Sequence, residues 1–147
     1  MTTVRRSALV PFTPEQMFRL VNDIESYPAF LPGCRQARCL AASEDEVTAQ
    51  LELARGGLSR SFTTCNRLQR NKMIEVRLID GPFRRLEGFW RFEEMDAGQA
   101  CRVTLDLEFE FSSRVVALAI GPVFNAIANS LVDAFAIRAR EVYGKQL

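Results

Sequence analysis

The chain has 147 residues, of which 48% are hydrophobic and 25% charged, proportions typical of an ordinary soluble globular protein. Nineteen Lys and Arg residues against 18 Asp and Glu residues leave a net charge of +1, which argues against a generally basic nucleic-acid binder and against DNA as a partner. Histidine is absent from the sequence, so Ser-His and Cys-His nucleophile pairs, a histidine general base and His-ligated zinc are all excluded.

The length predicts one domain, residues 1–147, able to bury roughly two thirds of its unfolded surface without disulfides. The first ten residues contain two arginines but no apolar core segment, and we expect no stretch that approaches the ~20 apolar residues of a membrane span. A cytoplasmic location is therefore expected. The four cysteines, Cys34, Cys39, Cys65 and Cys101, form no CxxC pair, so reduced thiols and no metal site are expected.

The chain begins with a short strand at Val4–Val10, which Pro11 ends. A helix start follows, in which Thr13 is the predicted N-cap, Pro14 occupies the first helical position and Gln16 closes a capping box. The helix is short, and its predicted inward face consists of Met17, Phe18 and Val21.

A second short turn is predicted after Asp23, and it leads into the segment Tyr27–Gly33. This segment is too apolar for a solvated loop, because it carries Tyr27, Phe30 and Leu31 among two prolines and a glycine. Two interpretations are open: these side chains form a plug in the core, or they form an apolar lip at the mouth of a pocket.

Between Cys34 and Phe111 the polarity alternates with a period of two residues, which predicts strands. Gly56-Gly57 and Asn71-Lys72 are expected turns, and Gly81-Pro82 breaks the pattern again. Short turns between successive strands indicate an antiparallel meander. The expected strands cover residues 47–53, 58–68, 73–80, 86–95 and 101–111, with earlier ones completing a sheet of about seven.

Gly88 interrupts the apolar face of one of these strands, between Leu86 and Trp90. Such a gap can admit a ligand or a closely approaching backbone. The last strand is the clearest of the set, because its apolar residues alternate with polar and acidic ones. The apolar residues are Cys101, Val103, Leu105, Leu107, Phe109 and Phe111.

A long amphipathic helix is predicted from about Ser113 to Tyr143, with Ser112 or Ser113 as its N-cap. Gly121-Pro122 should produce a kink or a fresh start inside it. The apolar stripe needs a partner, and the apolar sheet face needs a cover, so an α+β fold with a curved antiparallel sheet wrapped around this helix is predicted. The stripe is expected to contain Leu118, Phe124, Ile127, Ala128, Leu131, Ala134, Phe135 and Val142.

This order of elements resembles the START-like (SRPBCC, helix-grip) superfamily, and within it the branch of coenzyme-Q-binding proteins and ribosome-association toxins of the RatA type. The sequence Leu-Pro-Gly-Cys around Gly33 is similar to the toxin-named form, whereas quinone-binding members tend to have a bulky aromatic there. The motifs that carry the resemblance span nearly the whole chain: Val21-Asn22-Asp23, Ser26-Tyr27-Pro28-x-Phe30-Leu31-Pro32-Gly33-Cys34, Asp80-Gly81-Pro82-Phe83, Phe109-Glu110-Phe111 and Leu131-Val132-x-Ala134-Phe135-x-x-Arg138-Ala139-x-x-Val142-Tyr143.

The resemblance implies a hydrophobic cavity between helix and sheet that binds ubiquinone, another polyprenyl quinone or a lipid, with a role in respiration and no required cofactor. A solid core is the alternative interpretation of the same residues. Arg138, Tyr27 or Asn66 can donate a hydrogen bond to a quinone head group, and the Tyr27–Gly33 lip can touch a membrane surface transiently. The expected ligand-binding residues are Tyr27, Phe30, Leu31, Phe62, Trp90, Phe92, Phe109, Phe111, Phe124, Ile127, Leu131 and Phe135.

The toxin name implies a second function, in which the protein binds the large ribosomal subunit and blocks subunit joining. Arg67, Arg70 and Lys72 are the candidate rRNA contacts, and with Arg55 and Arg60 they are expected to cluster around one hairpin end. Ordinary solvated charges explain the same residues. Enzymatic activity is not expected, because no acid pair can be placed in the apolar pocket; the candidate acids Asp80, Asp106 and Glu108 are predicted at turns or on polar strand faces.

Overall fold

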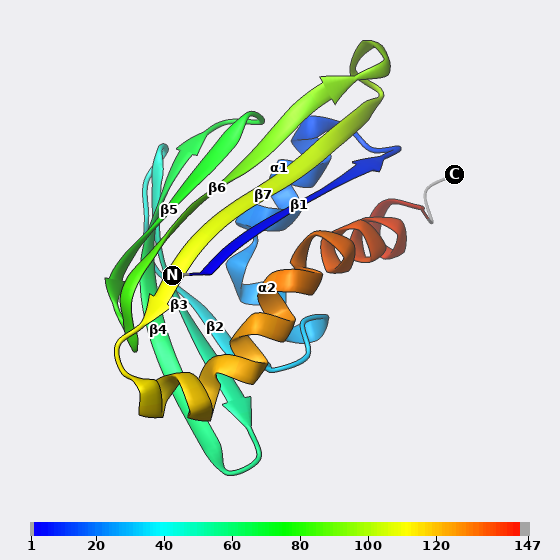
Figure 1. The fold of residues 1–147 in the computed structure, drawn as a ribbon. Helices are drawn as coiled ribbons and strands as arrows, with labels where there is room; N and C mark the ends of the chain where they lie inside the picture. The colour runs from blue at the N-terminus through cyan, green and yellow to red at the C-terminus, as the bar shows by residue number, and fades with distance from the viewer. Residues whose placement is uncertain (1, 145–147) are drawn as a thin grey trace.

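A computed structural model describes residues 2–144 and shows seven strands, two α-helices and two short 3₁₀ helices (Figure 1). The elements in chain order are β1 (Thr2–Val10), α1 (Pro14–Asn22), η1 (Ile24–Ala29), β2 (Cys34–Ala42), β3 (Glu46–Arg55), β4 (Leu58–Gln69), β5 (Met73–Asp80), β6 (Phe83–Met95), η2 (Asp96–Gly98), β7 (Ala100–Phe111) and α2 (Arg114–Tyr143).

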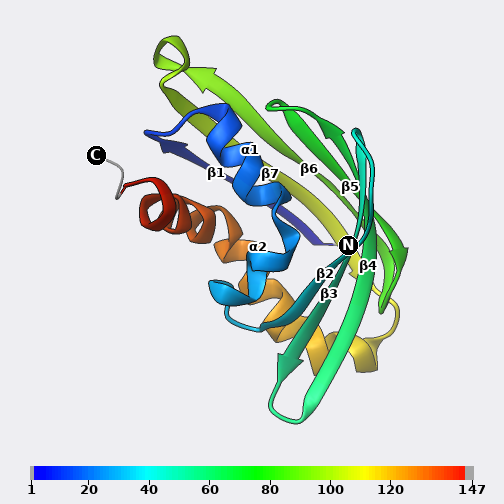
Figure 2. The ribbon, with the colours of Figure 1, turned by 180° about the vertical axis from the view of Figure 1, so that it is seen from behind.

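All seven strands belong to one antiparallel sheet with the order β1-β7-β6-β5-β4-β3-β2. Strands β2 to β7 form a meander, and β1 returns to pair with β7 from Thr2 opposite Phe109 to Val10 opposite Cys101. The sheet curves around α2, with α1 and η1 beside the same helix (Figures 1 and 2). The predicted α+β helix-grip fold is therefore confirmed.

The start of α1 follows the predicted capping chemistry. The Gln16 amide donates to the Thr13 hydroxyl oxygen at 3.1 Å, and the Thr13 amide donates to the Gln16 side-chain oxygen at 2.9 Å. The C-terminal end of α2 is joined to α1 by a hydrogen bond, in which the Tyr143 hydroxyl donates to the Gln16 carbonyl at 3.1 Å. The predicted inward residues of α1 are buried: Met17, Phe18 and Val21.

Helix α2 begins at Arg114, where the Val116 amide donates to the side-chain oxygen of the N-cap Ser113 at 3.1 Å. It runs as one continuous helix through Pro122, so of the two alternatives predicted at Gly121-Pro122, a kink or a fresh start, the fresh start does not occur. By length and composition alone α2 is able to cross a membrane, contrary to the expectation that no segment qualifies. In this fold it instead packs one face onto the sheet.

The predicted stripe of α2 was wrong at its two ends. Leu118 is 75% exposed and Val142 is 37% exposed, so both face away from the core. Six residues separate Leu118 from Phe124, and at about 3.6 residues per turn this places them roughly 120° apart around the helix. The residues of α2 that are buried are Ile120, Gly121, Phe124, Ile127, Ala128, Val132, Phe135 and Ala139.

Gly88 resolves one of the alternatives that the sequence left open. A Cβ atom at this position would lie 2.3 Å from the carbonyl oxygen of Asp106 and 2.9 Å from the Leu107 side chain. The glycine therefore permits the close approach of β7, and not the approach of a ligand.

Candidate ligand cavity

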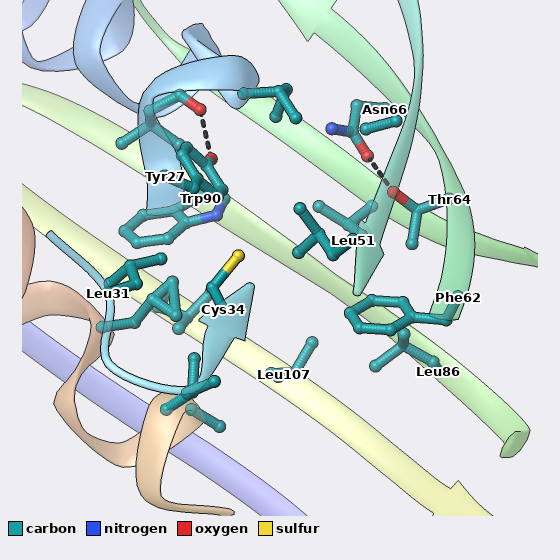
Figure 3. A pocket seen from close by; sticks show the side chains of 18 of the residues that line it. Tyr27, Leu31, Cys34, Leu51, Phe62, Thr64, Asn66, Leu86, Trp90 and Leu107 are labelled. Carbon is teal, nitrogen blue, oxygen red and sulfur yellow. Dashed lines mark hydrogen bonds between the residues drawn. The ribbon is translucent and has the colours of Figure 1, made fainter. Parts of the chain in front are cut away.

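A cavity lies between α2, the concave face of the sheet and the segment that joins η1 to β2 (Figure 3). Its volume is about 110 Å³, counted as the space open to the centres of water-sized molecules. At roughly 10–15 Å³ per water centre, this is space for a ring-sized group. The fold therefore contains a cavity between helix and sheet, and the alternative interpretation, a solid core, does not describe this region.

The structure brings seven of the twelve predicted ligand-binding residues to this cavity and places five elsewhere. Those in the lining are Tyr27, Leu31, Phe62, Trp90, Phe124, Ile127 and Leu131. The lining does not include Phe30, Phe92, Phe109, Phe111 and Phe135.

Phe135 is the centre of a solid aromatic cluster at one end of the cavity. Its ring is fully buried and meets the rings of Tyr27, Phe30 and Trp90 edge-on, with centroid separations of 5.4, 5.1 and 5.3 Å. Trp90 and Tyr27 also line the cavity. The cluster therefore forms a wall, with Phe135 behind it.

Phe124 is the centre of a second cluster at the other end. Its ring lies 4.7 Å from that of Phe109, 4.8 Å from that of Phe83 and 6.0 Å from that of Phe62. Phe109 is fully buried, and only Phe62 and Phe124 reach the cavity. The hollow thus lies between two packed aromatic clusters.

Most of the remaining lining is aliphatic and was not singled out from the sequence. Most of these residues come from the inward positions of the strands, so the alternation that predicted each strand was also the signal for them, whereas Val21, Ile24 and Ala128 come from helices. Examples labelled in Figure 3 are Leu51, Leu86 and Leu107. The polar additions are Cys34 and Thr64, and they lie beside Asn66, which was already a predicted head-group donor.

Two polar side chains of β4 form a pair in the cavity wall. The Thr64 hydroxyl donates to the side-chain oxygen of Asn66 at 2.9 Å, and the two residues are 6% and 7% exposed. This hydrogen bond uses the acceptor of the amide and leaves its two N–H donors, which Figure 3 shows turned away from Thr64. The indole nitrogen of Trp90 also lies toward the middle of the cavity (Figure 3).

The cavity is electrically neutral. Among the described residues, no Asp, Glu, Lys or Arg lines it. Burial raises the pKa of Cys34 to about 11 and raises the pKa of Tyr27, whose hydroxyl donates to the Val21 carbonyl. Both groups therefore stay protonated near neutral pH. A site of this kind accepts an uncharged molecule and offers it N–H donors.

The segment Tyr27–Gly33 turns its apolar side chains inward. Tyr27 and Leu31 are 6% and 4% exposed, and both line the cavity from within the core. Phe30 packs against Phe135, with the Arg138 guanidinium 5.3 Å above its ring. Arg138 lies outside the cavity lining, so of the three predicted head-group donors the structure leaves Asn66 in position.

The basic residues near β4 form two groups, and the expectation of one cluster was wrong. Arg55 and Arg60 lie at the β3–β4 hairpin, whereas Arg67, Arg70 and Lys72 lie at the β4–β5 turn. Antiparallel strands of this length separate the two ends by about 3.3 Å per residue. Arg67 is also paired with Glu46, at 3.8 Å.

The fold and the uncharged cavity define a START-like protein. A family model described as "Polyketide cyclase / dehydrase and lipid transport" matches residues 10–136, so the chain belongs to this family. A START superfamily protein from Mycobacterium smegmatis has the same fold, with a TM-score of 0.76 at 20% identity over 95% of this chain and 98% of that one.

Two curated relatives show which branch of the family this is. The chain is 45% identical over 143 residues to "Ribosome association toxin RatA" of Escherichia coli K12, covering 97% of this chain and 90% of the relative. It is 27% identical over 143 residues to "Coenzyme Q-binding protein COQ10 homolog B, mitochondrial" of Xenopus laevis, covering 95% of this chain and 59% of the relative. The resemblance read from the sequence motifs is therefore confirmed.

Proposed function

We propose that the protein is a non-enzymatic, cytoplasmic carrier that binds a neutral apolar molecule with acceptor oxygens, of which a polyprenyl quinone such as ubiquinone is the best fit. The observation that carries this proposal is the uncharged cavity with N–H donors in its wall. Quinone carbonyls are neutral acceptors that match these donors, and the ring matches the cavity's size. The name of the Xenopus relative supports the same ligand class.

The apolar lining supplies the affinity in this proposal. Burial of apolar ligand surface contributes roughly 25 cal/mol per Å², so each 100 Å² contributes about 2.5 kcal/mol. The amide of Asn66 adds direction, since a hydrogen bond from its N–H group to a ligand oxygen contributes about 0.5–1.5 kcal/mol.

Binding without catalysis follows from the same lining. General acid–base chemistry requires a group that exchanges a proton near neutral pH, and the raised pKa values of Tyr27 and Cys34 remove the two titratable residues of the wall from that range. The acids Asp106 and Glu108 pair instead with Arg5 at 2.5 Å and Arg85 at 3.6 Å. Cyclase activity, which the family description includes, would need such a group.

The test is organic extraction of the protein from a quinone-producing host, followed by mass spectrometry. Leu131→Trp places an indole in the cavity and should remove the bound molecule, while Ile137→Trp adds the same group at a 57% exposed position of α2 and should leave it bound. A stoichiometric quinone in the parent and in Ile137→Trp, but not in Leu131→Trp, supports the proposal. An empty extract from a folded parent contradicts it.

The head-group contact can be tested separately. Asn66→Leu removes the N–H donors while keeping a side chain of similar size, and we expect quinone affinity to fall about tenfold. Asn129→Leu changes an exposed amide on α2 and should leave affinity unchanged. Equal affinity for all three proteins would remove Asn66 from the binding contact.

Ribosome association is the second candidate function, favoured by the 45% identity to a protein with that name. Arg70 and Lys72 are exposed at the β4–β5 turn, where they can meet rRNA phosphates. The double variant Arg70→Glu/Lys72→Glu should then lose co-sedimentation with large ribosomal subunits and keep its quinone. Arg102→Glu, an exposed position on β7, is the matched control.

A further inference from the structure

The outer face of the first half of α2 is apolar and exposed. Val115 and Leu118 are 76% and 75% exposed, and Pro122 and Ala126 continue the same face at helical spacing. No charged residue occurs between Arg114 and Asp133. The first half of this helix is therefore apolar on both sides, toward the cavity and toward solvent.

The β3–β4 hairpin adds a second apolar projection at the same end of the molecule (Figures 1 and 2). Leu58 is 49% exposed, and a Cβ atom added at Gly56 or Gly57 would have nothing within 4 Å. We call this end the α2 tip; it consists of the hairpin residues Arg55–Arg60 and the first helical turns Arg114–Leu118.

The charge of the α2 tip is positive. Arg55, Arg60 and Arg114 form no salt bridge with another residue in the range 2–144. The nearby acids include Glu52, which pairs with Arg35 at 3.5 Å, Glu110, which pairs with Arg84 at 4.0 Å, and Asp80 at the end of β5. Exposed apolar side chains beside unpaired arginines are the pattern of a surface that enters an anionic bilayer.

We propose that the α2 tip docks on an anionic lipid bilayer, with Leu58, Val115 and Leu118 entering the acyl boundary and the arginines contacting the headgroups. The tip is a hairpin end beside a helix end, and a deformable bilayer accepts such projections, whereas a protein partner would need a matching hollow. Tyr27 and Leu31 of the predicted Tyr27–Gly33 lip face inward, so the two side chains that were expected to contact a membrane there are not available for insertion.

The position of the tip gives the docking a role, and this role rests on the proposed function. The two elements that form the tip also line the cavity, through Leu53 and Phe62 of the hairpin arms and Phe124 of α2. A bilayer at the tip is thus separated from the cavity by Leu53 and by the aromatic cluster around Phe124. An apolar ligand would exchange there between protein and membrane.

Flotation of the full chain with vesicles tests the proposal. The vesicles contain phosphatidylethanolamine and phosphatidylglycerol in equal amounts, or phosphatidylcholine alone. The parent should float with the anionic vesicles, and Val115→Ser/Leu118→Ser should lower the partition coefficient about tenfold or more. Ile137→Ser removes an exposed apolar residue elsewhere on the same helix and should float like the parent.

The charges are tested by Arg55→Gln/Arg60→Gln/Arg114→Gln, which should abolish the preference for anionic vesicles. Equal flotation of the parent and Val115→Ser/Leu118→Ser overturns the proposal. The proposal is also overturned if the parent does not float. It is overturned as well if the double variant floats like the parent and differs only in self-association, measured by light scattering, or in co-sedimentation with ribosomal subunits. Retention of quinone by a parent that does not float rejects the docking alone, and flotation without quinone rejects the proposed function alone.

Discussion

The cluster around Phe135 and the cavity beside it are built from the same sheet and the same helix, yet one is solid and the other hollow. At Phe135 four aromatic rings meet edge-on and fill the space between α2 and β6. One to two turns earlier on the helix, the cavity is bounded by Ala128 on α2 and by Ala49 on β3. The layer is closed where large rings from the helix, the sheet and η1 meet, and it is open where these two small side chains face the space between helix and sheet.

This difference shows that apolar content does not identify a binding wall. Phe109 and Phe135 are as apolar as the cavity residues, but their neighbours fill the space around them completely. What makes a cavity is the size of the side chains that face one another across the layer. Substitutions of equal chemistry should therefore have different consequences in the two regions.

The largest effect is expected from Phe135→Ala. Removal of a fully buried ring from a packed cluster should lower the free energy of unfolding by about 3–5 kcal/mol. Urea denaturation measures the loss, and Ile137→Ala, two residues away and 57% exposed, should stay within about 0.5 kcal/mol of the parent. A loss below about 1 kcal/mol for Phe135→Ala would contradict the solid packing described here.

Two alanines of α2 test the contrast directly. Ala139 is fully buried outside the cavity, so Ala139→Leu should overpack the core and cost about 1–3 kcal/mol of unfolding free energy. Ala128→Leu adds the same three carbons where the cavity has space, and it should cost less while displacing the bound ligand. If thermal or urea unfolding shows the same loss for both, then the hollow beside Ala128 is filled by rearrangement.

The loop that closes the cavity depends on Gly33, whose φ of +91° is disfavoured for other residues. A Cβ atom there would lie 2.6 Å from Cγ2 of Val123 and 3.2 Å from Cδ1 of Ile127. Gly33→Ala should cost about 1–3 kcal/mol of unfolding free energy. Gly57→Ala, with open space and no positive φ, should cost far less, and equal losses by urea denaturation would exclude the close approach of α2 to Gly33.

The smallest effect concerns pH and compares a cavity thiol with a solid-core thiol. Burial raises the pKa of both Cys34 and Cys101 from 9.0 to about 11. Between these values the folded protein keeps protons that the unfolded chain releases, so the free energy of unfolding should fall as pH rises from 9 to 11.

Cys101→Ala should reduce this pH slope, and Cys39→Ala, at an exposed position, should leave it unchanged. Denaturation at a series of pH values measures the slopes.

The rate of alkylation by iodoacetamide gives a second comparison of the two thiols. Extraction of the ligand should increase this rate for Cys34 more than for Cys101, because the empty cavity then gives the reagent a route to Cys34. Equal protection of the two thiols in extracted protein would argue against an accessible cavity.

Much of the fold could be predicted because its signals are local. The capping box at Thr13 and Gln16, the cap at Ser113 and the alternation of β7 each depend on neighbours within a few residues. The same alternation marked the inward face of β4, where Asn66 lies. Family membership followed from motifs that recur along the chain.

The candidate site could be predicted only in part, because its shape depends on contacts between distant elements. Nothing local distinguishes Phe124, which reaches the cavity, from Phe109, which its neighbours enclose. Leu118 illustrates the same limit. Its place in an apolar run predicted that it is buried, but its direction around the helix axis leaves it exposed.

The sequence by itself determined the elements, their order, the sheet and its covering helix, and it excluded imidazole chemistry. The reason is that periodicity and capping act through the nearest turns and residues of the chain. The tertiary structure alone decided where the core is hollow, which face of α2 meets solvent, and that Gly88 serves a close strand and not a ligand. These are properties of side-chain volumes that meet across the layer, and residues far apart in the chain supply them.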